Sequence, residues 1–219
     1  MTPPKRVYLA RRHPSLSRDA FPDAWRAHHA LGQHSAALRR SYPRSAYCVV
    51  LDPAFPCDGV GMLWTRDLGV LAAPAADPDA IKAMREDELR VFAAPVFDAA
   101  TVVTEHVLRP APAVREGAGC LLVFLRGKAD EDWFARVQAG CERVSAPGLA
   151  GVVLGKAGPA GTFPCDALAE FWFADGAGAL RAAPCVGGAL ASFGEPPLAM
   201  ATEVCLAWPP LRPPPDLAA

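Results

Sequence analysis

The chain contains the same sequence pattern twice. Phe55-Pro56-Cys57-Asp58 recurs 108 residues later (163 − 55 = 108) as Phe163-Pro164-Cys165-Asp166. Tryptophans share this separation, in the pairs Trp25 and Trp133, and Trp64 and Trp172. Near the end of each copy Thr104-Glu105 recurs as Thr202-Glu203, at a separation of 98 residues (202 − 104 = 98). Because one separation relates matches that lie far apart, the pattern predicts a duplicated fold, and two units are too few for a solenoid.

Each copy predicts the element order β-α-β-β-α-β. In the first copy we expect strands at residues 7–9, 47–51, 60–65 and 101–108, and helices from about residue 17 or 19 to 40 and over 81–89. In the second copy we expect strands at 120–126, 149–154, 167–173 and 202–208, and a helix over 130–144. Its second helix is poorly specified, because it is interrupted by Gly176, Gly178, Pro184, Gly187 and Gly188. This order is typical of the ferredoxin-like α+β motif.

The repeat also predicts how the chain is divided. We expect a ferredoxin-like repeat over residues 1–110, a second, degenerate repeat over 117–210 and a Pro-rich tail over 211–219. A four-stranded sheet with helices on one face leaves its other face apolar and in need of cover. Two tethered sheets cover each other, so we predict a pseudo-dimeric α+β barrel that is stable as a monomer. Exposed sheet edges leave further homodimerisation open.

Charge and cysteine content limit the function classes. Lys and Arg number 22 and Asp and Glu 23, which provides no basic surface for nucleic acid or for a membrane. No segment approaches the ~20 apolar residues of a membrane span, and the N-terminus does not have the pattern of a secretory signal. The seven cysteines form no C-x-x-C pair and are expected to be reduced, mostly buried thiols. Together these features predict a cytoplasmic protein.

Three segments at the first helix and before it resemble the EthD-like family of dimeric α+β barrel proteins, whose first helix carries Phe-x-x-x-Trp-x-x-x-His. They are Val7-Tyr8-Leu9-Ala10-Arg11-Arg12, Leu16-Ser17-Arg18-Asp19-Ala20-Phe21 and Trp25-Arg26-Ala27-His28-His29-Ala30. The family's third strand is similar to Asp58-Gly59-Val60 through Leu63-Trp64. The end of the family's unit is similar to Asp87-Glu88 together with Thr104-Glu105-His106-Val107. The resemblance covers about residues 5–109 and is weak over 117–209.

This resemblance implies a protein that acts on a small hydrophobic molecule, aromatic or polyketide-like. The chemistry implied is that of a cofactor-independent oxidoreductase or of a dehydratase or cyclase, although fold-level likeness does not fix a reaction. The sequence carries no P-loop, dinucleotide-binding, zinc-protease or serine-hydrolase motif, so no cofactor is expected. No metal is expected either, because no carboxylate or thiolate joins the histidines at residues 13, 28, 29 and 34 at a familiar ligand spacing.

His29 is the candidate catalytic residue. Phe21, Trp25 and His29 are four residues apart and form one stripe on a helix, which must face the sheet. Burial lowers the pKa of a histidine, and a neutral imidazole in an apolar pocket can accept a proton or bind a carbonyl or hydroxyl group. The alternative is a packed histidine that satisfies a backbone carbonyl. In the second copy Trp133 is kept while Val137 stands at the position of His29, which favours a functional role.

The substrate-binding candidates are Phe21, Trp25, His28, Trp64, Asp87, Glu105 and His106. Helical geometry alone does not choose between His28 and His29, and only the Trp-x-x-x-His spacing of the resemblance selects His29. Core packing is an alternative for Trp64. The repetition of Glu105 as Glu203 indicates structure at least as much as catalysis.

Three hypotheses remain at this stage. The first is an EthD-like enzyme with its pocket between the first helix and the sheet of the first copy. The second is a non-catalytic small-molecule-binding or accessory protein for a partner oxidase. The third is a pure scaffold, which requires that the first copy enclose no ligand.

Overall fold

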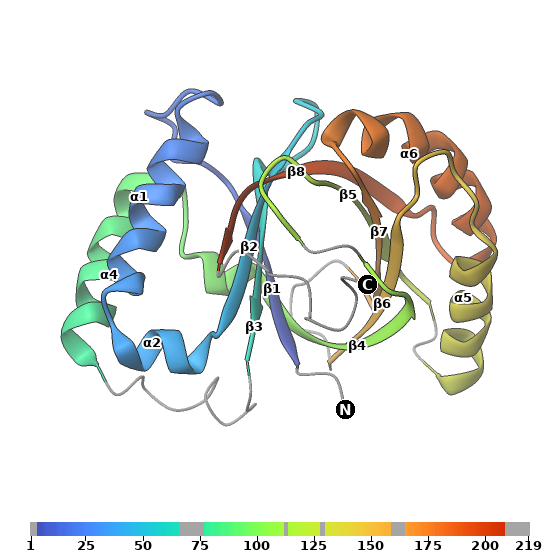
Figure 1. Ribbon diagram of the computed structural model, residues 1–219, viewed down its shortest axis with the longest axis horizontal. Coiled ribbons are helices and arrows are strands. Elements are labelled where there is room, and N and C mark those ends of the chain that lie inside the picture. Colours follow the sequence, from blue (N-terminus) through green and yellow to red (C-terminus); the bar gives the residue numbers. More distant parts are fainter. Residues whose placement is uncertain (1–3, 66–76, 112–113, 128–129, 159–164, 209–219) are drawn as a thin grey trace, which may run out of the picture.

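A closed antiparallel barrel forms the centre of the molecule (Figure 1). The computed structural model describes residues 4–65, 77–111, 114–127, 130–158 and 165–208. The strands follow the order β1-β3-β2-β8-β5-β7-β6-β4 around the barrel. Their bounds are β1 Lys5–Ala10, β2 Arg44–Val50, β3 Gly59–Trp64, β4 Ala100–Arg109, β5 Gly119–Leu125, β6 Gly151–Ala157, β7 Ala167–Phe173 and β8 Leu198–Trp208. The predicted α+β barrel is therefore confirmed.

Helices cover the barrel on two opposite sides (Figure 1). The first side holds α1 (Phe21–Gln33), α2 (Ala36–Ser41) and α4 (Pro78–Val91), and the second holds α5 (Glu131–Arg143) and α6 (Gly176–Leu190). Short 3-10 turns, η1 (Val96–Ala99) and η2 (Ala191–Phe193), precede β4 and follow α6. None of the helices in the described ranges is long and apolar enough to cross a membrane.

The two halves of the chain have the same strand order. The first half runs β4-β1-β3-β2 and the second β8-β5-β7-β6, and they meet where β2 pairs with β8 and β4 with β6. Apolar side chains fill the lumen and the space under each helix layer, which gives three buried clusters. The Pro-rich tail predicted over 211–219 lies outside the described residues.

The Cys-Asp part of the repeated motif makes the same contacts in each half, while Phe163 and Pro164 of the second copy lie outside the described residues. The Asp58 carboxylate accepts a hydrogen bond from the backbone N–H of Arg12 at 3.0 Å, and Asp166 accepts one from the N–H of Gly127 at 2.9 Å. The backbone N–H of Asp58 donates to the carbonyl of Ala10 at the end of β1, and that of Asp166 to Leu125 at the end of β5, both at 2.8 Å. The preceding cysteines are buried, and burial raises the pKa of Cys57 to about 11 and that of Cys165 to about 12. The Cys-Asp pair therefore has a structural role.

Two helices differ from the sequence-based expectation. The helix expected to reach residue 40 ends at Gln33, and Ser35 starts α2 by accepting a hydrogen bond from the N–H of Leu38 at 3.2 Å. The expectation of a poorly specified second helix in the second half was wrong, because α6 runs unbroken over Gly176–Leu190. Pro184 lies on its exposed side. Gly176 lets α6 approach the sheet, since a Cβ there would lie 2.7 Å from the Glu203 carboxylate.

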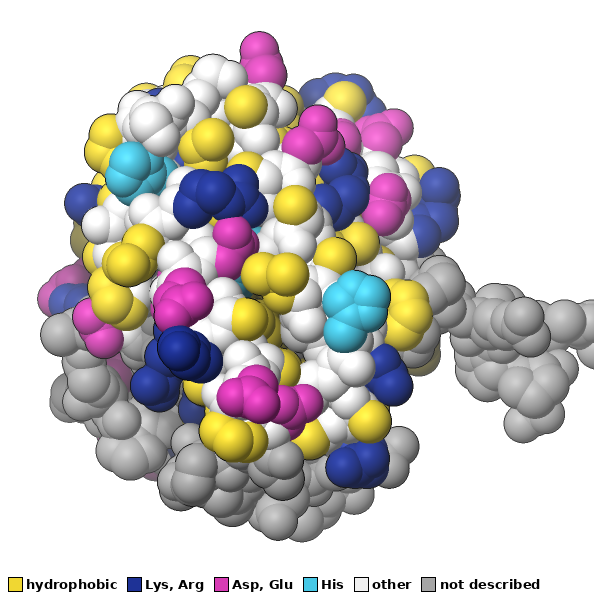
Figure 2. All heavy atoms as spheres, turned by 90° about the vertical axis from the view of Figure 1, so that its left-hand side faces the viewer, with side chains coloured by type: hydrophobic (Ala, Val, Ile, Leu, Met, Phe, Trp, Pro, Cys, Tyr) yellow, Lys and Arg dark blue, Asp and Glu magenta, His cyan; other side chains and the backbone are white. Residues whose placement is uncertain are grey.

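Figure 2 shows the face formed by the first helix layer. Acidic and basic side chains are interspersed over it, and neither sign gathers into one patch. The candidate site described next lies beneath this layer, between α1, α4 and the sheet.

Candidate functional site

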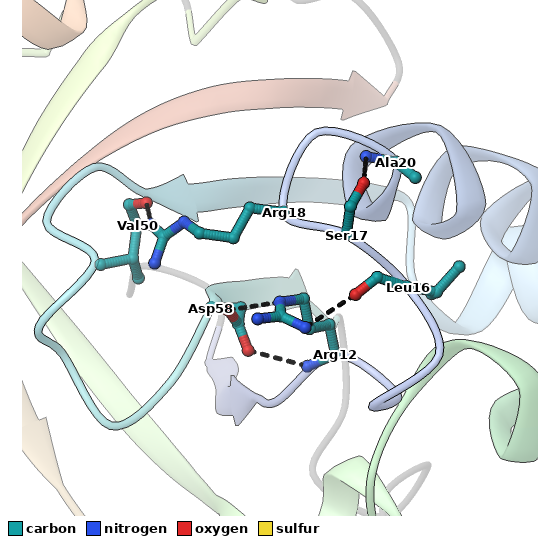
Figure 3. A network of polar contacts seen from close by, with 7 residues as sticks. All are labelled: Arg12, Leu16, Ser17, Arg18, Ala20, Val50 and Asp58. Carbon is teal, nitrogen blue, oxygen red and sulfur yellow. Dashed lines mark hydrogen bonds and ion pairs between the residues drawn. The ribbon is translucent and has the colours of Figure 1, made fainter.

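A hydrogen-bonded loop fixes the position of α1 at the end of the barrel. Arg12 donates from Nε to Asp58 at 3.1 Å and from its guanidinium to the Leu16 carbonyl at 2.7 Å (Figure 3). Arg18 reaches over to the carbonyl of Val50 at the end of β2, at 2.6 Å (Figure 3). These contacts hold the segment between β1 and α1 against the β2–β3 connection, so α1 enters the fold at a defined point.

Below this loop, α1 buries an aromatic cluster against the sheet. The rings of Phe21 and Trp25 stack with centroids 5.0 Å apart, and Trp25 lies 5.0 Å from the ring of Tyr47 on β2. Phe92, which follows α4, packs edge-on against Trp25 at 5.8 Å. Phe21 and Trp25 are fully buried. The cluster gives the site an apolar, aromatic wall.

His29 lies beside this wall and is neutral at pH 7. Its Nδ1 is 2.8 Å from the hydroxyl oxygen of Tyr47, and its Nε2 is 2.7 Å from the side-chain amide of Gln33. Burial, followed by the nearby His28, lowers the pKa of His29 to about 4. Burial also raises the pKa of Tyr47, so the tyrosine keeps its proton. The pair is thus a neutral imidazole and a neutral phenol.

Both ring nitrogens of His29 have protein partners. Nδ1 faces the Tyr47 hydroxyl, which can donate or accept, and Nε2 faces the side-chain amide of Gln33, which offers an N–H donor or a carbonyl acceptor. The two partners therefore accommodate either tautomer of the neutral imidazole.

His28 faces α4 instead of the sheet. Its Nδ1 is 2.9 Å from Oδ2 of Asp87, and its ring packs edge-on against Phe92 at 5.4 Å. Burial lowers the pKa of His28, although the hydrogen bond to Asp87 opposes this. Asp87 also accepts hydrogen bonds from Arg90, at 2.7 Å from Nε and 3.2 Å from the terminal nitrogen. His28 and His29 therefore flank the aromatic cluster on two sides, each with its own polar partner.

A second polar cluster lies inside the barrel lumen. Lys5 is fully buried and donates to Glu105 at 2.6 Å and to Glu170. Trp64 donates from Nε1 to the other oxygen of Glu105 at 3.0 Å, and Arg44 lies over the Trp64 ring at 3.9 Å. These side chains project from five strands into the lumen, on the opposite face of the sheet from His29.

The carboxyl groups of this lumen cluster differ in the direction of their pKa shift. Burial alone would raise the pKa of Glu105, but the charge and hydrogen bond of Lys5 and the bond from Trp64 outweigh it, so the pKa falls. Glu170 is more deeply buried and has a hydrogen bond from Lys5 only, so its pKa is raised. Burial disfavours the ammonium form of Lys5, but Glu170 and Glu105 outweigh it and raise the pKa of Lys5. Glu105 is thus the more acidic of the two carboxyl groups.

The structure brings together only part of the predicted site. Five of the predicted residues meet between α1, α4 and the sheet, namely Phe21, Trp25, His28, His29 and Asp87. Trp64 and Glu105 lie in the lumen, and His106 is exposed on β4, 5.1 Å from the ring of Phe134 on α5. Among the described residues no group of three or more His, Cys, Asp or Glu side chains is placed to hold a metal ion.

Several residues of both clusters escaped the sequence analysis. They are Gln33, Tyr47, Lys5, Arg44 and Glu170. The i, i+4 spacing of His29 and Gln33 was a usable signal, because it places both on one helix face. Nothing in the sequence marked Lys5, since a lysine near a chain end is ordinarily solvated.

The strand register corrects one sequence match. Lys5 lies opposite Val103 on β4, and Cys120, at the same place in the second half, lies opposite Thr202 on β8. Glu105 therefore corresponds to Val204 and not to Glu203, because the match of Thr104-Glu105 with Thr202-Glu203 is one residue out of register. A shift of one residue moves a side chain to the other face of a sheet. In the second half Cys120 and Val204 stand at the positions of Lys5 and Glu105, so this ion pair is not repeated there.

No family model and no curated protein matches the chain. Several solved structures, in contrast, are similar to it. A candidate monooxygenase from Fusobacterium nucleatum has a TM-score of 0.61 at 10% identity, covering 94% of each chain. A candidate monooxygenase from Lactobacillus acidophilus has a TM-score of 0.57 at 10% identity, covering 94% of this chain and 96% of its own. An anthrone oxidase-like protein has a TM-score of 0.58 at 10% identity, with 94% and 92% covered. The likeness spans nearly the whole chain and shows that it has the dimeric α+β barrel fold.

Proposed function

We propose that the chain consists of two tandem ferredoxin-like repeats of the EthD-like type, with a functional site in the first repeat. The strand order of the two halves is the same, and Asp58 and Asp166 make equivalent turn contacts. The two linked sheets form a pseudo-dimer within one chain, which we expect to be a monomer. Because all seven cysteines are free thiols, we also propose a cytoplasmic location.

The site acts on a small hydrophobic molecule, aromatic or polyketide-like, in oxidoreductase-type chemistry without a cofactor. The observation that carries this proposal is the neutral His29, paired with the Tyr47 hydroxyl beside a buried aromatic wall. Through Nε2 the neutral imidazole can accept a proton from a ligand or, in its other tautomer, give a hydrogen bond to a ligand oxygen once the Gln33 side chain swings away. The names of the structural neighbours, two candidate monooxygenases and an anthrone oxidase-like protein, agree with this reaction class.

A second candidate function is supported by the same contacts. Both ring nitrogens of His29 already have protein partners, Tyr47 and Gln33, as in a histidine that only packs. In that case the chain is a non-catalytic binding or accessory protein for a partner oxidase. Such a protein binds the hydrophobic molecule and leaves it chemically unchanged.

Turnover of anthrone separates the two candidates. The purified protein is incubated with anthrone in air, and oxygen uptake and product formation are followed for the wild type, His29→Ala and the matched control His34→Ala, whose histidine is exposed at the end of α1. An enzyme loses roughly 100-fold or more of its rate in His29→Ala and none in the control. Binding without product in the wild type favours the accessory protein. Equal turnover by His29→Ala contradicts the role of His29.

A further inference from the structure

His28, Asp87 and Arg90 form a hydrogen-bonded chain across the contact between α1 and α4. Asp87 Oδ2 lies 2.9 Å from His28 Nδ1, and Arg90 binds both oxygens of the same carboxylate, at 2.7 and 3.2 Å. Asp87 and Arg90 are three residues apart on α4, so the helix itself holds this ion pair in place. The carboxylate is thereby fixed in front of the imidazole.

The hydrogen bond to Asp87 determines which ring nitrogen of His28 carries the proton. Burial opposes ionisation of Asp87, but hydrogen bonds from Arg90 and His28 outweigh it and lower the pKa of the carboxyl. An ionised carboxylate only accepts hydrogen bonds, so Nδ1 of His28 carries the proton and Nε2 keeps its lone pair. Within the described part of the chain Nε2 of His28 has no hydrogen-bond partner, whereas both nitrogens of His29 are engaged.

We propose that His28 is the general base of the site, with Asp87 and Arg90 as positioning residues, and that its substrate class is a phenol or enol. The inference rests on the proposed function and adds a proton acceptor to it. Nε2 of His28 takes the hydroxyl proton of the ligand. The O–H bond breaks, an N–H bond forms, and the electron pair stays on the ligand oxygen as a phenolate or enolate. The imidazolium formed on His28 is stabilised by the Asp87 carboxylate at its Nδ1.

The strength of the base limits the ligand class. The other charged or titratable groups close to the His28 ring are Asp87, Arg90 and His29, and the remaining contact is the apolar ring of Phe92. Because burial keeps the pKa of His28 below its ordinary value of 6.5, the imidazole is a weak base. An ordinary alcohol holds its proton far too tightly for it, whereas an acidic phenol or the enol of a β-dicarbonyl compound does not.

The tautomer of His28 is read directly by long-range proton–nitrogen NMR on the intact, ligand-free protein. The proposal predicts a proton on Nδ1 and a midpoint below pH 6.5 in the wild type. In Asp87→Asn, which keeps the shape of the side chain, the midpoint falls further because the carboxylate charge that favours the imidazolium is lost. A midpoint that does not move in Asp87→Asn would contradict the coupling of Asp87 to the imidazole. A proton on Nε2 of His28 in the wild type overturns the proposal.

Proton transfer is measured with 4-nitrophenol, whose ionised form absorbs visible light. We expect the wild type to bind it and to increase its ionised fraction, His28→Gln to bind it without that increase, and His34→Ala to behave as the wild type. Wild-type binding without ionisation, or an unchanged ionised fraction in His28→Gln, overturns the role of His28 alone. Absence of binding in the wild type overturns the proposed function and the role of His28 with it.

Discussion

Lys5 on β1 and Glu170 on β7 form an ion pair inside the barrel lumen, and this pair joins the first half of the chain to the second. The two strands are not neighbours in the barrel, so the lysine side chain crosses the lumen to reach its partner. Both side chains are excluded from water, with 0% and 1% of their surface exposed. A buried ion pair of this kind favours one arrangement of the two halves more than it adds net stability.

Removing the lysine should destabilise the barrel strongly. Lys5→Met leaves Glu105 and Glu170 buried without their cation, which is expected to cost about 3–5 kcal/mol of unfolding free energy. The matched control is Lys82→Met, because Lys82 pairs with Glu86 on the surface and such a pair contributes at most about 1 kcal/mol. Urea denaturation followed by circular dichroism measures both. Equal losses in the two variants would show that the lumen pair is not a stabilising contact.

The two lumen carboxyl groups should respond differently to neutralisation. Glu105 accepts hydrogen bonds from Lys5 and Trp64 and its pKa is lowered, whereas Glu170 accepts from Lys5 alone and burial raises its pKa. Glu105→Gln is therefore expected to cost ~1.5–3 kcal/mol, the range for a hydrogen bond to a charged group. Glu170→Gln keeps the shape of the side chain and removes a charge that burial already opposes, so it should cost clearly less. The reverse order, in the same denaturation experiment, would contradict this difference between the two carboxyl groups.

Stability should fall as the pH drops below neutrality, partly through His29. Its folded pKa of about 4 lies below the ordinary value of 6.5, so its contribution is complete above pH 6.5 and is lost as the pH falls to about 4. The full loss amounts to about 3 kcal/mol. His29→Gln should flatten this part of the stability curve, and His34→Gln should not. Parallel curves for the wild type and His29→Gln would mean that the pKa of His29 is the same in the folded and the unfolded protein.

The repeated aspartates should be equivalent in stability experiments. Asp58→Ala and Asp166→Ala each remove the acceptor of a backbone N–H at the same turn of their half. We expect each variant to lose about 0.5–1.5 kcal/mol, the usual net contribution of one hydrogen bond, because the Gly127 donor is exposed and the Arg12 donor only partly buried. Asp58→Ala should lose somewhat more, because it also releases Arg12. No loss in one variant beside a large loss in the other would argue against equivalent roles.

The barrel could be predicted from the sequence because its signals are local and repeated. The Phe-Pro-Cys-Asp turn recurs at a fixed separation, and alternation marks most strands. The break after Gln33 was missed, since residues on both sides of Ser35 favour helix. The helix α6 was also missed, because glycines and Pro184 lower helix propensity, whereas burial of Ala179, Val186 and Leu190 against the sheet outweighs it.

The candidate site was only partly predictable, for a reason of geometry. A helical stripe places Phe21, Trp25 and His29 together from spacing alone. Which residues of distant strands meet them depends on the register between strands, which a single sequence does not reveal. Tyr47 and Glu170 are therefore recognised only in the folded barrel, and Trp64 and Glu105 prove to lie on the other side of the sheet from His29.

Ligand binding at α1 is the central claim, and native mass spectrometry of the purified protein tests it most directly. The wild type, His29→Ala and the exposed control His34→Ala are compared under the same gentle conditions. The account predicts an apolar molecule that stays bound to the wild type and to the control and is lost from His29→Ala. A bound molecule retained equally by all three proteins, or bound by none of them, would contradict a ligand site beside His29.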